Sequence, residues 1–142
     1  MRVLLRLLPI VLVAALAGCA QQETSSNDFK GSEKAVADTI ADLQSNAQGR
    51  KPGVICSDVL STDLAAKLKT AGHDCTSEME KIAADADDYL LEVTDVTING
   101  TTATATVESR RGGKADAETT FSLVREDGDW RLSDFGKSSP AG

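Results

Sequence analysis

The chain is poor in histidine, the residue on which many familiar catalytic sites depend. Its 142 residues contain a single histidine, His73, and no motif surrounds it. A Ser-His-Asp or Cys-His catalytic set therefore cannot be assembled. No internal repeat is present, and no apolar run is long enough to cross about 30 Å of hydrocarbon comfortably. These absences exclude histidine-dependent hydrolases and leave the biochemical function open.

Positive charge is also scarce. The chain has 15 Lys and Arg against 22 Asp and Glu, a formal net charge of −7. A surface with this excess of acids repels phosphate backbones, so we expect no nucleic-acid partner. It repels anionic membrane surfaces for the same reason.

The first twenty residues, MRVLLRLLPIVLVAALAGCA, are the most informative segment. Arg2 and Arg6 give a positive start, and a short apolar run containing Pro9 leads to small residues and Cys19. This order predicts a secretory signal peptide over residues 1–18 rather than a transmembrane anchor or an uncleaved core helix.

The sequence Leu16-Ala17-Gly18-Cys19 resembles the lipobox of bacterial lipoproteins. The resemblance implies cleavage before Cys19, whose thiol would carry a diacylglyceryl group. Two acyl chains anchor a protein stably, whereas one chain, at about 0.8 kcal/mol per buried methylene, does so only marginally. Ala20 rather than Asp after the cysteine implies outward routing to the outer membrane in a double-membrane cell. In a single-membrane cell, the protein would face outside on the cell membrane.

Removal of the signal peptide would take away two arginines and no acid. The mature chain would then have 13 Lys and Arg against 22 Asp and Glu, a formal charge of −9. With Cys19 lipidated, Cys56 and Cys75 remain as a pair in an oxidising compartment. A disulfide between them would close a loop of about 20 residues and add roughly 3 kcal/mol.

Two alternatives to the disulfide are two buried free thiols and a metal site formed by Cys56, His73 and Cys75. The His-x-Cys spacing is unlike that of structural zinc sites, and no fourth ligand is evident. We therefore predict the disulfide, no metal site and no cofactor.

Composition divides the rest of the chain into a tether, one domain and a tail. Residues 19–32 comprise the lipidated cysteine and a polar stretch that predicts a flexible tether. A single domain is expected over residues 33–136. Residues 137–142 are expected to form a short disordered tail.

Apolar periodicity predicts three helical regions at the start of the domain. The first has one stripe, Val36, Ile40, Leu43 and Ala47, with Ser32 as its cap, and ends at Gly49 and Pro52. The second covers residues 54–70, is broken near Ser61 or Thr62, and ends at Gly72. The third begins at Ser77 in a capping box with Glu80. Its expected inner face is Met79, Ile82, Ala83 and Ala86.

From Tyr89 the apolar period becomes two, which predicts strands. A change of phase near Asp95 indicates a bulge, and Asn99-Gly100 predicts a tight hairpin. Residues 111–114 and Asp127-Gly128 predict two further turns. The expected fold is α+β, with three N-terminal helices packed on a curved four-stranded antiparallel sheet.

Helices followed by hairpin strands that end in FSLVREDGDWRL make the chain similar to the nuclear transport factor 2-like, or cystatin-like, superfamily. The likeness extends to small lipoproteins of that fold and covers about residues 33–135. It implies a cone with a pocket between the first helix and the concave sheet. The fold often dimerises through its sheet, so a homodimer is one expectation. The expected pocket lining is Val36, Ile40, Leu43, Tyr89, Ala103, Ala105, Phe121 and Trp130.

Small alanines on the strands allow two interpretations. Ala103, Ala105 and Ala117 either leave room for a ligand over the sheet or let a helix pack closely. Polyketide-cyclase-like enzymes of the superfamily place an acid/base pair in the pocket, which makes Asp38 or Asp42 with Tyr89 the alternative, enzymatic assignment. The two acids lie off the apolar stripe of the first helix, where a solvated face is expected instead.

Three acids, Asp85, Asp87 and Asp88, crowd the end of the third helical region, where the helix dipole disfavours negative charge. A Ca²⁺ loop would explain them, but Leu90 and Val96 stand where an EF-hand needs Gly and Glu. A solvated, frayed helix end is the preferred interpretation.

Together these features predict a lipid-anchored, exported, non-enzymatic protein. It would bind a small apolar ligand or another envelope protein. The alternatives are an acid/base isomerase or hydrolyase of the polyketide-cyclase-like type, or a purely structural or regulatory module.

Overall fold

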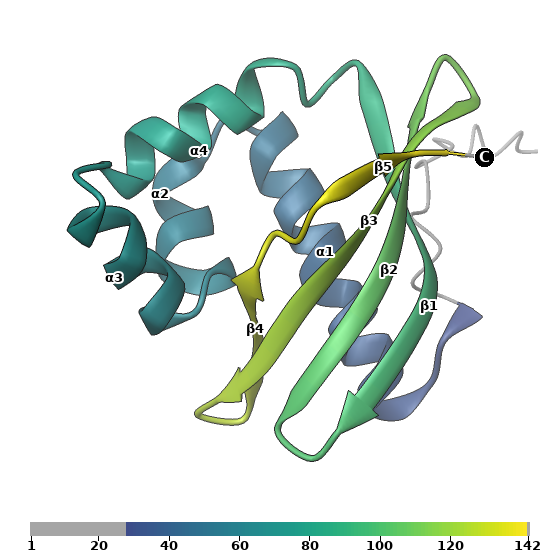
Figure 1. The fold of residues 1–142 in the computed structure, drawn as a ribbon, viewed down its shortest axis with the longest axis horizontal. Coiled ribbons are helices and arrows are strands. Elements are labelled where there is room, and N and C mark those ends of the chain that lie inside the picture. Colours follow the sequence, from purple (N-terminus) through teal and green to yellow (C-terminus); the bar gives the residue numbers. More distant parts are fainter. Residues whose placement is uncertain (1–27, 142) are drawn as a thin grey trace, which may run out of the picture.

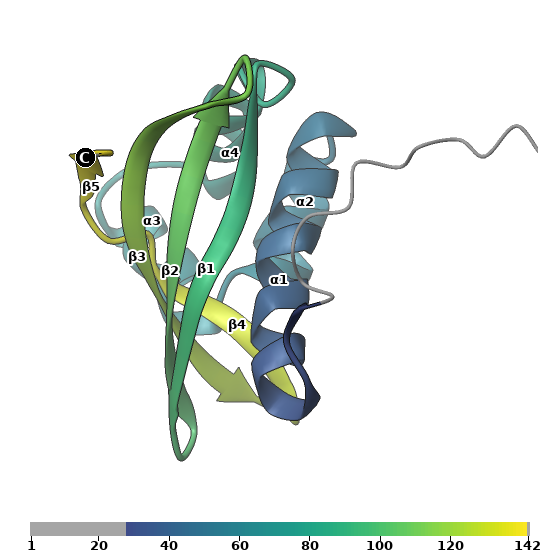
Figure 2. The same cartoon turned by 90° about the vertical axis from the view of Figure 1, so that its right-hand side faces the viewer.

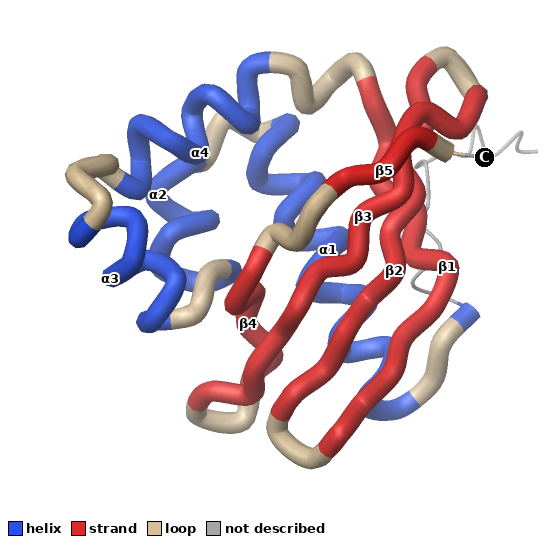
Figure 3. The backbone as a smooth tube through the Cα atoms, in the orientation of Figure 1, coloured by secondary structure: helices blue, strands red, loops and turns tan. Residues whose placement is uncertain are grey.

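A computed structural model of the protein describes residues 28–141. The predicted signal peptide, Cys19 and most of the predicted tether lie outside the described residues. Figures 1 and 3 show helices gathered beside and behind an antiparallel sheet. The expected α+β class is therefore confirmed. Across residues 28–141, no helix combines the length and the apolar character needed to span a membrane.

Helix α1 (Gly31–Gln48) is the central helix of the domain. Its predicted stripe is buried throughout, with Val36, Ile40, Leu43 and Ala47 each at most 4 % exposed. Gly49 ends the helix, as predicted. The start differs from expectation, since Lys30 rather than Ser32 occupies the cap position and makes no side-chain capping bond.

The second helical region consists of three short pieces rather than two. Helix α2 (Pro52–Val54) leads directly into a π-helical turn, η2 (Ile55–Val59), and then into α3 (Thr62–Thr70). The break falls at Ser61, whose side chain caps α3 by accepting a hydrogen bond from the amide of Leu64. The Glu126 carboxylate also accepts from the Thr62 amide at 3.1 Å and joins this helix start to the sheet. The predicted break and cap are confirmed.

Helix α4 (Cys75–Ala84) begins two residues earlier than the sequence indicated. Asp74 is its cap, and one carboxylate oxygen accepts from both the amide and the hydroxyl of Ser77. The predicted capping box at Ser77 and Glu80 is therefore wrong, because the Ser77 hydroxyl is used as a donor to Asp74. Ile82, expected on the inner face, is 37 % exposed.

The sheet has the strand order β1-β2-β3-β4, all antiparallel, with β5 added beside β3. Its strands are β1 (Tyr89–Asn99), β2 (Thr102–Arg111), β3 (Lys114–Glu126), β4 (Asp129–Asp134) and β5 (Ser138–Pro140). The three predicted turns lie between the first four strands. The predicted bulge is also present, because the register of β1 on β2 shifts between Val93 and Asp95.

The core lies between α1 and one face of the sheet, and Figure 2 shows these two layers edge-on. Buried side chains of α1 face buried residues of the strands, among them Ala105, Val107, Leu123 and Leu132. The Thr39 hydroxyl donates to the carbonyl of Trp130 at 3.2 Å and ties α1 to β4. Exposed threonines, including Thr97, Thr104 and Thr120, mark the opposite, polar face.

The C-terminal residues differ from the expected disordered tail. Residues 138–140 form β5, which pairs with Thr119, Glu118 and Ala117 of β3. Strand β4 pairs with β3 only from Ser122 onward. On the side of β3 where β4 lies, the residues before Ser122 therefore have no partner in β4. Strand β5 pairs with residues 117–119 on that side.

Candidate functional site

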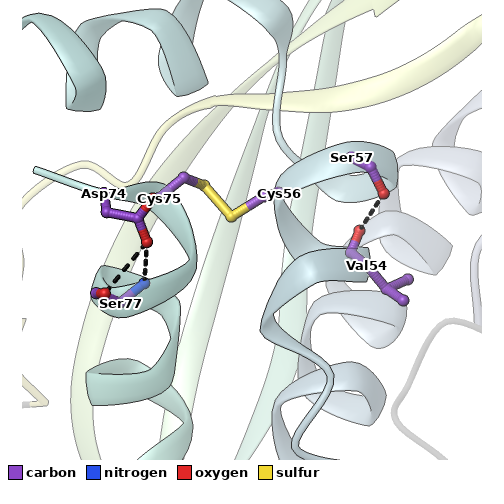
Figure 4. Close-up of a disulfide and its surroundings, with 6 residues drawn as sticks. All are labelled: Val54, Cys56, Ser57, Asp74, Cys75 and Ser77. Carbon is purple, nitrogen blue, oxygen red and sulfur yellow. Dashed lines mark hydrogen bonds between the residues drawn. A yellow bond between two sulfur atoms is a disulfide. The ribbon is translucent and has the colours of Figure 1, made fainter.

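A disulfide joins the helices at one end of the domain. Cys56 in η2 and Cys75 at the start of α4 are bonded, with a Cα–Cα distance of 6.1 Å (Figure 4). The predicted pairing is confirmed. Both cysteines are half-buried and pack against the hydrophobic core, so the bond holds α4 against η2.

The bonded cysteines leave no thiolate for a metal site with His73. The imidazole Nδ1 of His73 lies 3.1 Å from Glu78 Oε1, and both groups belong to an exposed ion-pair cluster with Lys81. The hydrogen bond from Lys81 is the largest cause that lowers the pKa of Glu78. His73 therefore occupies a surface loop, away from any catalytic arrangement in the described part of the chain.

Arg50 stabilises the acidic C-terminal end of α4. Its guanidinium donates to the carbonyl of Ala83 in the last turn of that helix and to Asp87 Oδ2 at 3.0 Å. A cation at a helix C-terminus interacts favourably with the dipole. The three acids are exposed, which agrees with the predicted solvated helix end, and Arg50 offsets part of their unfavourable charge.

A small pocket, here called the apolar pocket, opens where α1, α4 and the sheet meet. Its volume is about 100 Å³, and its exposed surface is almost wholly apolar. It is lined by Leu43, Gln44, Ala47, Ile82, Ala86, Tyr89, Leu91, Phe121 and Phe135. The rings of Phe121 and Phe135 meet edge to face, with centroids 6.2 Å apart, and both residues line the pocket.

The residues expected to line a cone pocket are only partly brought together. Leu43, Tyr89 and Phe121 line the apolar pocket. Trp130 lines a different cavity. The other four, Val36, Ile40, Ala103 and Ala105, are at most 4 % exposed and belong to the core.

Gln44 is a site residue that sequence reasoning missed. Its amide nitrogen donates to the carbonyls of Ala86 and Tyr89, and its oxygen accepts from the amide of Leu91 at 2.9 Å. The side chain is 4 % exposed. It therefore fixes the link between α4 and β1 beside the apolar pocket. Gln44 lies one helical turn after Ile40, beside the buried stripe of α1. That spacing is the sequence signal that could have predicted its burial.

A larger and more polar cavity, here called the acidic groove, lies between α1, η2 and β4. Its volume is about 470 Å³. Four aspartates, one arginine and five other residues line it: Ala35, Asp38, Thr39, Asp42, Asp58, Val59, Gly128, Asp129, Trp130 and Arg131. Arg131 donates to the carbonyl of Ser57 at 2.5 Å. Asp38 pairs with Lys34 at 2.7 Å.

The acid/base pair considered for an enzyme is not assembled. Asp38 and Asp42 line the acidic groove, whereas Tyr89 lines the apolar pocket. Partial burial, and secondarily the charge of Asp38, raise the pKa of Asp42. Burial is also the main cause that raises the pKa of Tyr89, with Asp85 adding to it and Arg111 opposing it. The Tyr89 hydroxyl donates to the carbonyl of Ile82 at 3.4 Å.

A third cavity, here called the β1 cleft, adjoins the apolar pocket at Tyr89. Its volume is about 250 Å³. It is lined by Gln48, Asp87, Asp88, Tyr89, Leu90, Arg110, Gly112 and Gly113. Arg110 is already paired with Glu108 at 2.6 Å and with Glu92 at 3.3 Å.

Comparisons with known proteins cover helices as well as strands of the domain. A solved NTF2-like protein of unknown function from Shewanella baltica OS155 is 12 % identical, with a TM-score of 0.47 over 75 % of this chain and 93 % of that one. No curated protein matches this chain. Residues 59–135 match the family described as low molecular weight antigen MTB12, C-terminal domain. Because this match spans more than half of the 142 residues, the chain belongs to that family.

Proposed function

We propose that this protein is a lipid-anchored, exported, non-enzymatic protein that binds another protein of the cell envelope. The lipobox-like Leu16–Cys19 sequence supports the anchor and the export. The disulfide supports an oxidising compartment, because such bonds persist mainly outside the cytosol.

The volume of the apolar pocket is the observation that carries the choice of a protein partner. Pockets for small ligands usually measure roughly 300–1,000 Å³. The apolar pocket is about 100 Å³, and Val36, Ile40, Ala103 and Ala105, which were expected to line a larger cone, are packed as core. The acidic groove is larger, about 470 Å³, but four aspartates line it, which does not suit an apolar molecule. The geometry therefore favours a protein surface over a container for a small apolar molecule.

One observation favours the enzymatic alternative. Asp42 has a raised pKa and lines a cavity of about 470 Å³, features that a general acid needs. However, Asp42 is an exposed residue on a groove that also holds Asp38, Asp58 and Asp129, and Tyr89 lies elsewhere. A dry pocket with a second acid/base group is the arrangement that this chemistry requires. We therefore propose binding of a protein partner, rather than catalysis, as the function.

Cross-linking on intact membranes tests the proposal. Cells that make the full chain would be treated with an amine-reactive cross-linker, and adducts would be identified by mass spectrometry. We expect a discrete protein adduct that depends on anchoring, so that the Cys19→Ser variant gives much less of it. The Asp63→Asn variant is the matched control, because Asp63 is an exposed acid on α3 and its change leaves the anchor intact.

Native mass spectrometry of the protein purified from its own membranes separates the alternatives. A small molecule retained at full occupancy, with no protein adduct on the membrane, would overturn the partner proposal in favour of ligand binding. Absence of both a ligand and an adduct would overturn binding altogether.

A further inference from the structure

The apolar pocket and the β1 cleft form two halves of one surface, because Tyr89 lines both. One half is apolar and has room for about one side chain. The other half is polar and carries Asp87 and Asp88. The combination of an apolar and an acidic half indicates the chemistry of the protein segment that would bind. This inference rests on the proposed function and extends it.

The apolar half has the properties of an anchor pocket. The pocket is open at the surface, so its apolar lining atoms lack dispersion partners on the open side. An inserted apolar side chain would supply those contacts. Ile82 lies on the rim and is one of two large hydrophobic residues in the described part of the chain that are exposed. A side chain that is fully desolvated in a well-packed pocket is the usual form of an interface hot spot.

The charges around the pocket specify what flanks the anchor. Asp85, Asp87 and Asp88 follow α4 directly before Tyr89. Three arginines among the described residues lie nearby. Arg110 is paired with two glutamates, and Arg50 is shared between Asp87 and the end of α4. Arg111, opposite Tyr89 in the sheet, offsets only part of the remaining acidic charge. The C-terminal end of α4 adds a partial negative charge. The rim is therefore complementary to lysine or arginine, and the net acidic chain agrees with a basic partner.

We propose that the apolar pocket and the β1 cleft are the docking site for a short segment of an envelope protein in which one apolar side chain is flanked by lysine or arginine. The apolar side chain enters between Ala86, Leu91 and Phe121. A flanking cation lies over the β1 cleft against Asp88.

Site-specific photocross-linking on the membrane-bound full chain tests this proposal. A benzophenone amino acid would replace Ile82, and in the control it would replace Val54, the other exposed large hydrophobic residue, which is equally exposed at 37 %. We expect a partner adduct from position 82 that is absent from position 54. Peptide mapping of that adduct should place the cross-link on an apolar residue with an adjacent lysine or arginine.

A charge reversal tests the electrostatic half with little risk to folding. Asp88 is exposed, so Asp88→Lys should reduce the adduct from position 82 about tenfold or more. Asp63→Lys, at an exposed acid on α3 outside both cavities, should leave it unchanged.

The results distinguish failure of the docking site from failure of the proposed function. An adduct mapped to lipid or to an acidic segment would overturn the docking site. So would equal adducts from positions 82 and 54, or equal effects of the two lysine variants. If position 82 gave no adduct while amine-reactive cross-linking still captured a partner, binding would stand and this site would fall. If neither method gave an adduct, both proposals would fall.

Discussion

At the scale of single residues, Gln44 shows how one buried polar side chain can hold a connection in place. Its amide group bonds to three backbone groups between Ala86 and Leu91. Buried polar groups are tolerated only when they are hydrogen-bonded. Here the Gln44 side chain and the three backbone groups satisfy one another. The connection from α4 to β1, which borders the proposed docking site, depends on this side chain.

We therefore predict that Gln44→Ala destabilises the protein. The Leu91 amide would lose its acceptor, and a buried group without a partner costs about 1–3 kcal/mol. Urea denaturation would measure the change in the free energy of unfolding. Gln48→Ala is the matched control, since Gln48 is exposed and bonds the same Ala86 carbonyl at 3.4 Å. Equal losses in the two variants would contradict this account.

Asp42 gives a pH dependence whose sign follows from its raised pKa. Its ordinary value is 3.8, and in the folded protein burial and Asp38 raise it. At pH values between the ordinary pKa of 3.8 and the raised pKa of the folded protein, the folded state binds more protons than the unfolded state. Stability from this group therefore falls as pH rises through that window, and the loss persists at neutral pH.

The expected result is that Asp42→Asn is more stable than the parent chain at neutral pH. The advantage should shrink as the pH falls toward 3.8, because both chains then carry a neutral side chain at this position. Thermal unfolding over a pH series would show it. The comparison variant Asp63→Asn changes an exposed acid outside the acidic groove. A constant difference across the series would show that charge at Asp42 is not the cause.

At the scale of elements, the features that depend on a few neighbouring residues were predictable from the sequence, and those that depend on the folded chain were not. The Asn99-Gly100 and Asp127-Gly128 turns were predictable because each requires positive φ at the glycine, and both glycines have it. The start of α4 was not, because Asp74 and Ser77 are comparable caps and the choice between them depends on the folded loop. Strand β5 had no signal at all, since Ser-Ser-Pro acquires a partner only where β4 leaves β3 unpaired.

The candidate site was predictable to a similar extent. The disulfide followed from counting cysteines, whereas the pocket lining did not follow from apolar periodicity. Periodicity shows which side chains face inward, as it did for Val36 and Ile40, but it does not show whether the interior is filled. The closing of the interior depends on how α1 approaches Ala103 and Ala105, a distance set by the whole sheet.

Strand β5 depends on Gly136, and this dependence gives a prediction. Gly136 has a φ of +65°, and a Cβ there would collide with the carbonyl oxygen of Thr120. Gly136→Ala should therefore detach β5 from β3. Amide hydrogen exchange should become faster at those of residues 117–119 whose amides face β5, and stay slow where the amide faces β2. Gly112→Ala is the control, because Gly112 also has positive φ but has open space around its Cβ. Unchanged exchange in Gly136→Ala would mean that the backbone shifts to keep β5 paired.

For the whole molecule, charge and anchoring act in opposite directions. After loss of the signal peptide the chain would carry a formal charge of −9, which an anionic membrane surface repels. Attachment would then come from the acyl chains on Cys19, which lies outside the described residues. Two chains suffice for stable attachment. The anchor would keep the domain close enough to meet membrane proteins, and the acidic surface would favour basic partners among them.

Metabolic labelling with palmitate tests the anchor directly. We predict that the full chain incorporates label and fractionates with membranes, and that Cys19→Ser does neither, because the acyl chains on Cys19 are the predicted attachment that outweighs the repulsion. A double variant, Cys56→Ser with Cys75→Ser, is the control for loss of a cysteine as such. It should keep its label, because its two cysteines are joined to each other in the folded domain and neither is the predicted acceptor. Label that persists on Cys19→Ser would place the lipid elsewhere and remove the argument for export by the lipoprotein route. Membrane association of an unlabelled Cys19→Ser chain would instead show that the acidic domain binds an envelope component by itself, with an affinity that outweighs the repulsion.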